Sequence, residues 1–182
     1  MGKRVELHLS LAALVVAVLA FGVSWWQLEV TRVHNSLSVR PYILITPHIE
    51  GESGRNGLYI SNEGLGTGLI KGLRVTVGGM DFQGLGESRW PDVLRKTELS
   101  PECFTKAWPL DGAAIRSGAE QPLLAFSKTK NSPFCKLQLI SFLTRDDVGV
   151  ELRYASMYGE EFIFKGSFSV NEKILLGLSE KK

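Results

Sequence analysis

The fold is decided by the stretch Val148-Gly149-Val150-Glu151-Leu152-Arg153-Tyr154-Ala155-Ser156-Met157. Its even-numbered residues from Val148 to Ser156 are mostly apolar. Between them stand two charged side chains, Glu151 and Arg153, followed by Ala155. An alternation of period two is typical of a strand that buries one face. We therefore predict a strand over 148–157 that covers a core.

Two neighbouring stretches extend this pattern. Residues 137–144 and 161–170 are predicted strands, joined to the first by turns at 145–147 and 158–160. In the last stretch, aromatic residues such as Phe162 and Phe164 alternate with Ile163 and Lys165. An apolar face opposite a mostly polar face indicates an antiparallel sheet packed on a core.

Earlier parts of the chain add further strands and one helix. We expect strands over 42–46, 57–61 and 70–77, with two shorter strands near 105–108 and 123–126. A short helix is predicted over 88–99, with Ser88 as its N-cap and Pro91 in its first turn. Seven or eight strands separated by turn signals predict a mainly β chain whose domain is an antiparallel immunoglobulin-like β-sandwich with one short helix.

The period-two strands also predict the core. Each expected member lies on the apolar side of its strand, so it should face inward. These residues are Leu73, Val75, Val77, Val150, Leu152, Tyr154, Phe162, Phe164 and Phe168.

The N-terminal part has a different character. Leu7 to Leu28 contains no formally charged side chain and follows Lys3 and Arg4. A helix of this length covers about 33 Å, enough to cross a hydrocarbon core of about 30 Å. Trp25 and Trp26 stand at its far end, where indole rings favour the membrane interface, so we predict that they are interface anchors.

A cleaved signal peptide is the alternative interpretation of this segment. Val18-Leu19-Ala20 is an acceptable cleavage context, but the apolar run continues through Trp26. Apolar regions of signal peptides span about 7–15 residues. We therefore expect an uncleaved signal anchor in a single-pass protein.

The predicted organisation has five parts. No helix breaker follows Leu28, and Val30, Val33 and Leu37 lie near one side of a continuing helix, which should end before Pro41. The parts are a cytoplasmic head (1–6), a transmembrane helix (7–28), a juxtamembrane helical stalk (29–40), the β-sandwich domain (41–178) and a flexible tail (179–182).

Two cysteines bear on orientation. Cys103 and Cys135, the two cysteines of the chain, each follow a Ser-Pro in the expected domain. They either form a disulfide, with Cα atoms under about 7 Å apart, or are two separate buried thiols. A disulfide suits an oxidising compartment. Positive charges on the two sides of the anchor nearly balance, so this pair and the short basic head favour a domain outside the cytoplasm.

Residues that could carry chemistry do not form a known motif. The glycines of 64–68 lack the spacing of a nucleotide loop, and we expect a tight turn that uses positive φ. His34 and His48 are too far apart and too few for a metal site, or for the base of a catalytic triad. The acidic pairs at 146–147 and 160–161 fall at turns. We therefore expect no catalytic, cofactor-binding or metal-binding residues, no cofactor and no enzymatic activity.

A resemblance can be stated from the segment after the anchor. Arg32-Val33-His34-Asn35-Ser36-Leu37-Ser38-Val39-Arg40-Pro41, followed by the turn Asn62-Glu63-Gly64-Leu65-Gly66, resembles small uncharacterised bacterial single-pass membrane proteins. Residues 154–160 are similar to their late strand and turn. This chain has Thr67-Gly68 where those proteins often have Pro-Ala. The resemblance implies the architecture and a bacterial inner membrane, and it implies no activity.

Two classes of function fit these expectations. The first is a membrane-anchored interaction or assembly protein whose partners are the lipid bilayer and either another protein or further copies of itself. The second is an anchored sensor or effector of a stress or defence system, with a cytoplasmic ligand-binding domain. The near-balanced net charge of +2 argues against a nucleic-acid partner.

Overall fold

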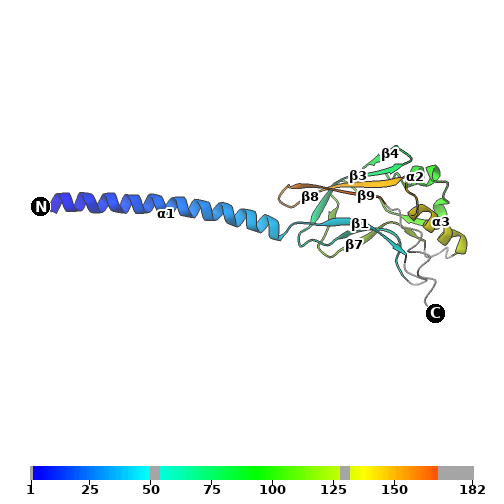
Figure 1. The fold of residues 1–182 in the computed structure, drawn as a ribbon, viewed down its shortest axis with the longest axis horizontal. Coiled ribbons are helices and arrows are strands. Elements are labelled where there is room, and N and C mark those ends of the chain that lie inside the picture. Colours follow the sequence, from blue (N-terminus) through cyan, green and yellow to red (C-terminus); the bar gives the residue numbers. More distant parts are fainter. Residues whose placement is uncertain (1, 50–53, 128–131, 168–182) are drawn as a thin grey trace. The chain divides into compact units, whose positions relative to one another are not determined.

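The computed structural model describes residues 2–49, 54–127 and 132–167 of the chain. The chain divides into two compact units, Met1–Val39 and Arg40–Lys182. Figure 1 shows the first as a helix and the second as a β domain. The end of the predicted strand over 161–170, including Phe168, and the expected flexible tail (179–182) lie outside the described residues.

The first unit is one helix, α1 (Gly2–Ser38). Within it, the segment Leu11–Ser38 is long and apolar enough to cross a membrane, and no part of its apolar window is buried in the structure. The helix passes Leu28 without a break and ends before Pro41, as the sequence predicts.

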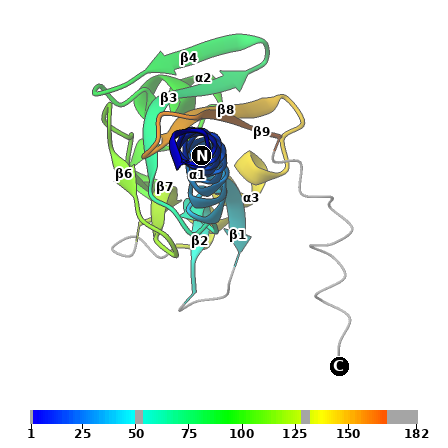
Figure 2. The same ribbon diagram turned by 90° about the vertical axis from the view of Figure 1, so that its left-hand side faces the viewer.

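The second unit contains two antiparallel sheets (Figure 2). The described part of the domain forms nine strands: β1 (Ile43–Ile49), β2 (Asn56–Asn62), β3 (Gly68–Val77), β4 (Met80–Gly84), β5 (Phe104–Lys106), β6 (Ala114–Ile115), β7 (Glu120–Phe126), β8 (Val148–Ser156) and β9 (Glu161–Ser167). One sheet has the order β1-β2-β7-β5. The other has the order β4-β3-β8-β9, with β6 paired to β3.

This strand order is that of an immunoglobulin-like sandwich. The order β1-β2-β7-β5 corresponds to the A-B-E-D sheet of that fold, and β3-β8-β9 corresponds to C-F-G. Strand β4 extends the second sheet in the place of the additional C′ strand. The sequence therefore predicts the fold class correctly, although it does not indicate β4 or β6.

The core lies between the sheets and follows the predicted alternation. Six of the nine expected core residues are buried: Leu73, Val75, Val77, Val150, Leu152 and Tyr154. Phe162 and Phe164 are only partly buried and pack against this core. They lie on β9, the edge strand of its sheet, where the opposite sheet covers them less completely.

The predicted helix of the domain is present, but its N-cap differs from the prediction. The helix α2 (Trp90–Lys96) lies inside the range predicted for it and buries Trp90, Val93 and Leu94. Its N-cap is Arg89 and not Ser88, although the Ser88 hydroxyl does accept a bond from the Trp90 backbone N–H at 3.4 Å.

The predicted strand over 137–144 is wrong. These residues belong to α3 (Pro133–Leu143), which buries Cys135, Leu139, Phe142 and Leu143. Ser132 caps this helix by accepting a bond from the Cys135 backbone N–H at 3.2 Å, and Pro133 occupies its first turn. A short apolar run does not distinguish a buried helix from a strand by period.

One buried amide holds together the end of the domain where the chain arrives from α1. Asn62 is fully buried, and its Oδ1 accepts bonds from the backbone N–H groups of Tyr42 at 3.1 Å and Gly64 at 3.0 Å. Its Nδ2 donates to the carbonyl oxygens of Gly66 at 2.7 Å and Ile115 at 2.9 Å. All four hydrogen-bonding capacities of the amide are therefore used.

Two glycines after Asn62, Gly64 and Gly68, allow other parts of the chain to approach closely. None of them has a positive φ, so the expected reason for glycine at this turn is wrong. A Cβ on Gly64 would collide with backbone atoms of Arg40 and Tyr42, and a Cβ on Gly68 would collide with the Ile43 side chain. The turn therefore packs directly against the first residues of the domain.

Candidate functional site

The long apolar helix α1 is the first candidate functional element. Trp25 and Trp26 are both exposed on α1, and Trp25 packs its ring against that of Phe21 with centroids 6.5 Å apart. Neighbouring helix positions point about 100° apart, so the two indoles cover different sides of the helix at one level. This arrangement suits a helix that is surrounded by lipid headgroups at that height.

The structure joins Cys103 and Cys135 in a disulfide, with Cα atoms 5.3 Å apart. Cys103 ends the 3₁₀ turn Pro101–Cys103, and Cys135 lies in the first turn of α3. Both residues are buried. The bond therefore fixes the start of α3 to the segment that precedes β5. A hydrogen bond connects the same two segments a second time: the Oε1 atom of Gln138 on α3 accepts a bond from the Ser100 backbone N–H at 2.8 Å.

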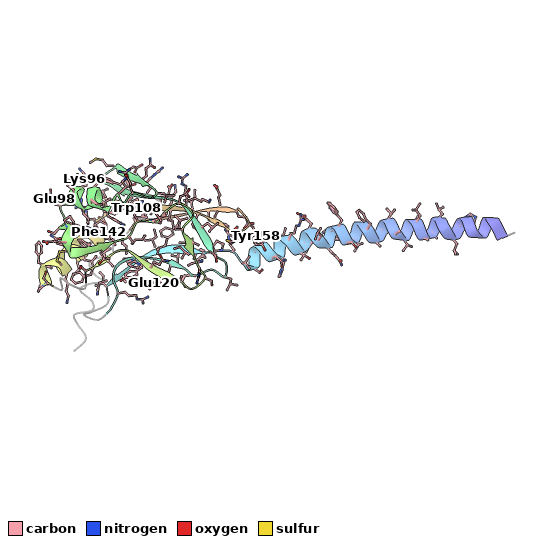
Figure 3. All side chains as sticks on the ribbon, turned by 180° about the vertical axis from the view of Figure 1, so that it is seen from behind. Lys96, Glu98, Trp108, Glu120, Phe142 and Tyr158 are labelled. Atoms are coloured by element: carbon pink, nitrogen blue, oxygen red, sulfur yellow. A yellow bond between two sulfur atoms is a disulfide. The ribbon has the colours of Figure 1, made fainter. Side chains whose placement is uncertain are left out.

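The helix held by this disulfide presents apolar side chains to solvent. Phe134 is 58 % exposed and Leu137 is 66 % exposed, while Phe142 on the inner side of α3 is fully buried. We call Phe134 and Leu137 the distal patch, because α3 lies at the end of the domain opposite to the start of β1 (Figure 1). Figure 3 labels Phe142 at this end, on the same helix. The two residues of the distal patch are three positions apart, so they are neighbours on one side of the helix.

A charged pair follows α3 directly. The Arg145 guanidinium donates two hydrogen bonds of 2.8 Å to the Asp147 carboxylate. The bonds lower the pKa of Asp147 and raise the pKa of Arg145, because each stabilises the charged form of the other. The acidic pair at 146–147 therefore includes one carboxylate that is already engaged, and it lies at a turn, as the sequence predicts.

A polar hollow lies on the outer face of the β4-β3-β8 sheet. Its volume is about 610 Å³, and its charged lining residues are Lys71, Arg74, Asp111, Glu151 and Arg153. Gly72 leaves room for the Arg153 guanidinium, since a Cβ at that position would lie 3.0 Å from it. Two of the charges are paired: Glu151 with Lys165 at 3.1 Å and Arg74 with Asp81 at 3.7 Å. The remaining balance is positive, so the hollow favours an anionic group.

A second polar cluster lies on the other sheet. The Nε2 atom of His48 is 3.2 Å from the Thr46 hydroxyl and 3.2 Å from a Glu120 carboxylate oxygen. Arg55 also binds Glu120, at 2.6 Å, and Figure 3 shows Glu120 at the edge of the domain. In a catalytic triad the carboxylate and the nucleophile meet opposite ring nitrogens. Here both meet Nε2, so this cluster is a network of surface bonds and not a triad.

Among residues 2–49, 54–127 and 132–167, no three histidine, cysteine or acidic side chains are grouped so that they could hold a metal ion. His34 lies on α1 and His48 on β1, which belong to different units of the chain.

No protein-family model, curated protein or solved structure matches this chain.

Proposed function

We propose that this protein is a membrane-anchored interaction protein, whose β-sandwich domain holds a protein partner near a bacterial inner membrane. The distal patch is the observation that carries the proposal. Phe134 and Leu137 are apolar and exposed, and the disulfide and the Ser132 cap hold their helix rigidly. A helix that is already fixed in place loses little backbone conformational entropy when a partner binds to it.

The disulfide supports a domain in the periplasm. Disulfides persist in oxidising compartments and are rare in the cytoplasm. In this orientation, the short basic head with Lys3 and Arg4 stays in the cytoplasm. The chain's likeness to uncharacterised bacterial single-pass proteins fits the same arrangement.

The experiment that tests the partner uses a photo-crosslinking amino acid at position 137 of the full chain in its native membrane. We expect crosslinks to a distinct protein, which mass spectrometry identifies, and we expect Phe134→Lys to reduce their yield. Ile163 is the matched control, because it is an exposed apolar residue at 58 % on another surface. Equal crosslinking from positions 137 and 163 would contradict the proposal, and crosslinks only between copies of this chain would replace the partner with a second copy.

A second candidate is a sensor or effector with a cytoplasmic domain that binds an anionic ligand. The polar hollow at Lys71 and Arg153 favours it. Alkaline phosphatase fused to the C-terminus separates the two candidates, because this reporter is active only outside the cytoplasm. An active fusion supports the first candidate, and an inactive fusion with an active cytoplasmic reporter supports the second.

A further inference from the structure

An exposed apolar stripe runs along the last part of α1. Val30, Val33 and Leu37 are spaced by three and four residues, and Trp26 continues the same spacing toward the N-terminus. All four side chains are 51–71 % exposed. We call Val30, Val33 and Leu37 the stalk stripe. Its spacing is that of the a and d positions of a coiled coil.

The other sides of the helix over residues 29–38 are polar, and their hydroxyl groups already donate hydrogen bonds within the helix. Thr31 donates to the Gln27 carbonyl at 2.7 Å, and Ser36 donates to the Val33 carbonyl at 3.0 Å. Ser38 donates to the Asn35 carbonyl at 2.9 Å. The stalk stripe is therefore the part of residues 29–38 whose exposed apolar surface would gain stability from being covered by a partner.

The segment is also a poor helix by composition. β-branched, histidine, asparagine and serine residues all rank well below alanine in helix propensity, and they fill most of its positions: Val30, Thr31, Val33, His34, Asn35, Ser36 and Ser38. A short exposed helix of this kind is marginal in water by itself. Packing of an apolar face supplies most of the stability of such helices in proteins.

We propose that the stalk stripe pairs with the stalk stripe of a second copy of this chain in a parallel coiled coil. The inference rests on the membrane anchor of the proposed function and not on its distal patch. Two anchors in one bilayer have the same orientation, which makes the pairing parallel. Confinement to the membrane also raises the effective concentration of one copy around the other.

The residues beside the stripe fit the same partner. With Val30 and Leu37 at a positions and Val33 at d, Glu29 occupies a g position and His34 the e position five residues later. In a parallel pair, g of one helix faces e of the next heptad in its partner. The Glu29 carboxylate of one copy therefore faces the His34 ring of the other copy, and the reciprocal pair forms by symmetry.

The test is cysteine crosslinking of the full chain in membranes, with two differently tagged copies expressed together. Single substitutions Val30→Cys, Val33→Cys and Leu37→Cys probe the stripe, while Arg32→Cys and Asn35→Cys probe the other sides of the same helix. The native Cys103–Cys135 disulfide stays in place. Under mild oxidation, we expect doubly tagged dimers to form about tenfold faster from the stripe positions, because Cα atoms beyond about 7 Å cannot be bridged.

Equal rates at all five positions would mean random collision and would overturn the inference, as would the absence of doubly tagged dimers. Crosslinks to a different protein would overturn it too. Leu137→Lys provides the separation from the proposed function, because it alters the distal patch and should leave the stalk crosslinks unchanged. If position 137 of the otherwise unaltered chain crosslinks to no protein while the stalk crosslinks persist, the proposed function alone is defeated. If position 137 crosslinks to a partner and the stalk positions give no doubly tagged dimer, this inference alone is defeated.

Discussion

At the scale of the residue, burial decides how much each side chain contributes to stability. Leu152 is fully buried between the sheets, Phe164 is partly buried on the edge strand, and Lys165 points outward on the same strand. The three residues belong to two paired strands, in which Leu152 lies opposite Phe164. Because the three residues lie close together on the sheet, replacing each by alanine shows how the cost in stability depends on the burial of the side chain.

We expect Leu152→Ala to lower the free energy of unfolding by about 2–5 kcal/mol, because it leaves a cavity in the core. Phe164→Ala should cost less than Leu152→Ala, since part of its ring already contacts water. Lys165→Ala removes a surface ion pair and should cost at most about 1 kcal/mol. Denaturant unfolding of the three variants measures the order of their stabilities. If Lys165→Ala were the most destabilising of the three, the register of β9 would be wrong.

Asn62 offers a sharper test of a single side chain. Asn62→Ala leaves two backbone N–H groups and two carbonyl oxygens without their partner, so we expect a loss of at least about 3 kcal/mol. Asn62→Asp has nearly the same shape, but a carboxylate cannot donate to the Gly66 and Ile115 carbonyls. It should destabilise the domain comparably in thermal unfolding at neutral pH, and a wild-type melting temperature for Asn62→Asp would contradict the bonding described.

The Arg145–Asp147 pair links stability to pH. The pKa of Asp147 is lowered in the folded domain by the hydrogen bonds from Arg145, so the unfolded chain binds this proton more tightly. The stabilisation is therefore present above the ordinary pKa of an aspartate and is lost as the pH falls through the lowered value.

Arg145→Gln should raise the pKa of Asp147 toward its ordinary value, which an NMR pH titration of its carboxyl carbon measures. The effect on stability near neutral pH should stay below about 1 kcal/mol, because both side chains are partly exposed. An unchanged Asp147 titration in this variant would show that the pair does not form in solution.

At the scale of the element, the disulfide and α3 act together. A bond between residues separated by 32 positions restricts the unfolded chain and should stabilise the domain by about 3–4 kcal/mol. Replacing both cysteines by serine should therefore lower the melting temperature by many degrees. Treatment of the wild-type protein with a reductant should have the same effect and should not affect the double variant further, whereas a reductant-insensitive wild-type protein would show that no disulfide is present.

The elements also show how far the sequence alone can be interpreted. Period-two alternation identifies β3, β8 and β9 because each is long and buries one face. It fails for α3, whose apolar residues form a short run with no polar side to reveal a helical period. The Ser132-Pro133 pair was the local signal for a helix start there, since it supplies both the cap and the first turn.

Short strands and tertiary contacts are less accessible. Strand β6 has two residues and exists only because it pairs with β3, which no local pattern encodes. The sequence does not indicate the distal patch either, because the predicted strand over 137–144 includes Leu137 and the helix α3 is not predicted. Composition and spacing alone do indicate the long apolar helix α1, and they leave the Cys103–Cys135 disulfide open as one of two possibilities.

At the scale of the whole molecule, the anchor and the domain carry separate sets of tryptophans. Trp90 is fully buried and Trp108 is nearly so, with their rings in edge-to-face contact at 5.5 Å. Trp25 and Trp26 are exposed on α1. Fluorescence quenching from the lipid phase therefore reports on the anchor.

We expect brominated lipids to quench a fraction of the fluorescence of the reconstituted protein, most strongly when the bromine atoms lie close to the headgroups. The variant with Trp25→Phe and Trp26→Phe should lose this quenching and keep the emission of the domain. Stronger quenching from bromine at the bilayer centre would place the two indoles in the wrong part of the membrane.

The contacts around Asn62 have a mechanical consequence. Strand β1 starts at the end of the domain that is tethered through Arg40, runs toward the end that carries α3, and pairs with β2 through seven residues in register. When the anchor is pulled against a partner held at the distal patch, the load runs along β1. The bonds between β1 and β2 are then sheared together instead of being unzipped one by one, and those of Asn62 and Gly66 to residues 40–42 meet the load first. We therefore expect the β1–β2 pairing to resist unfolding when the domain is pulled through its N-terminal tether.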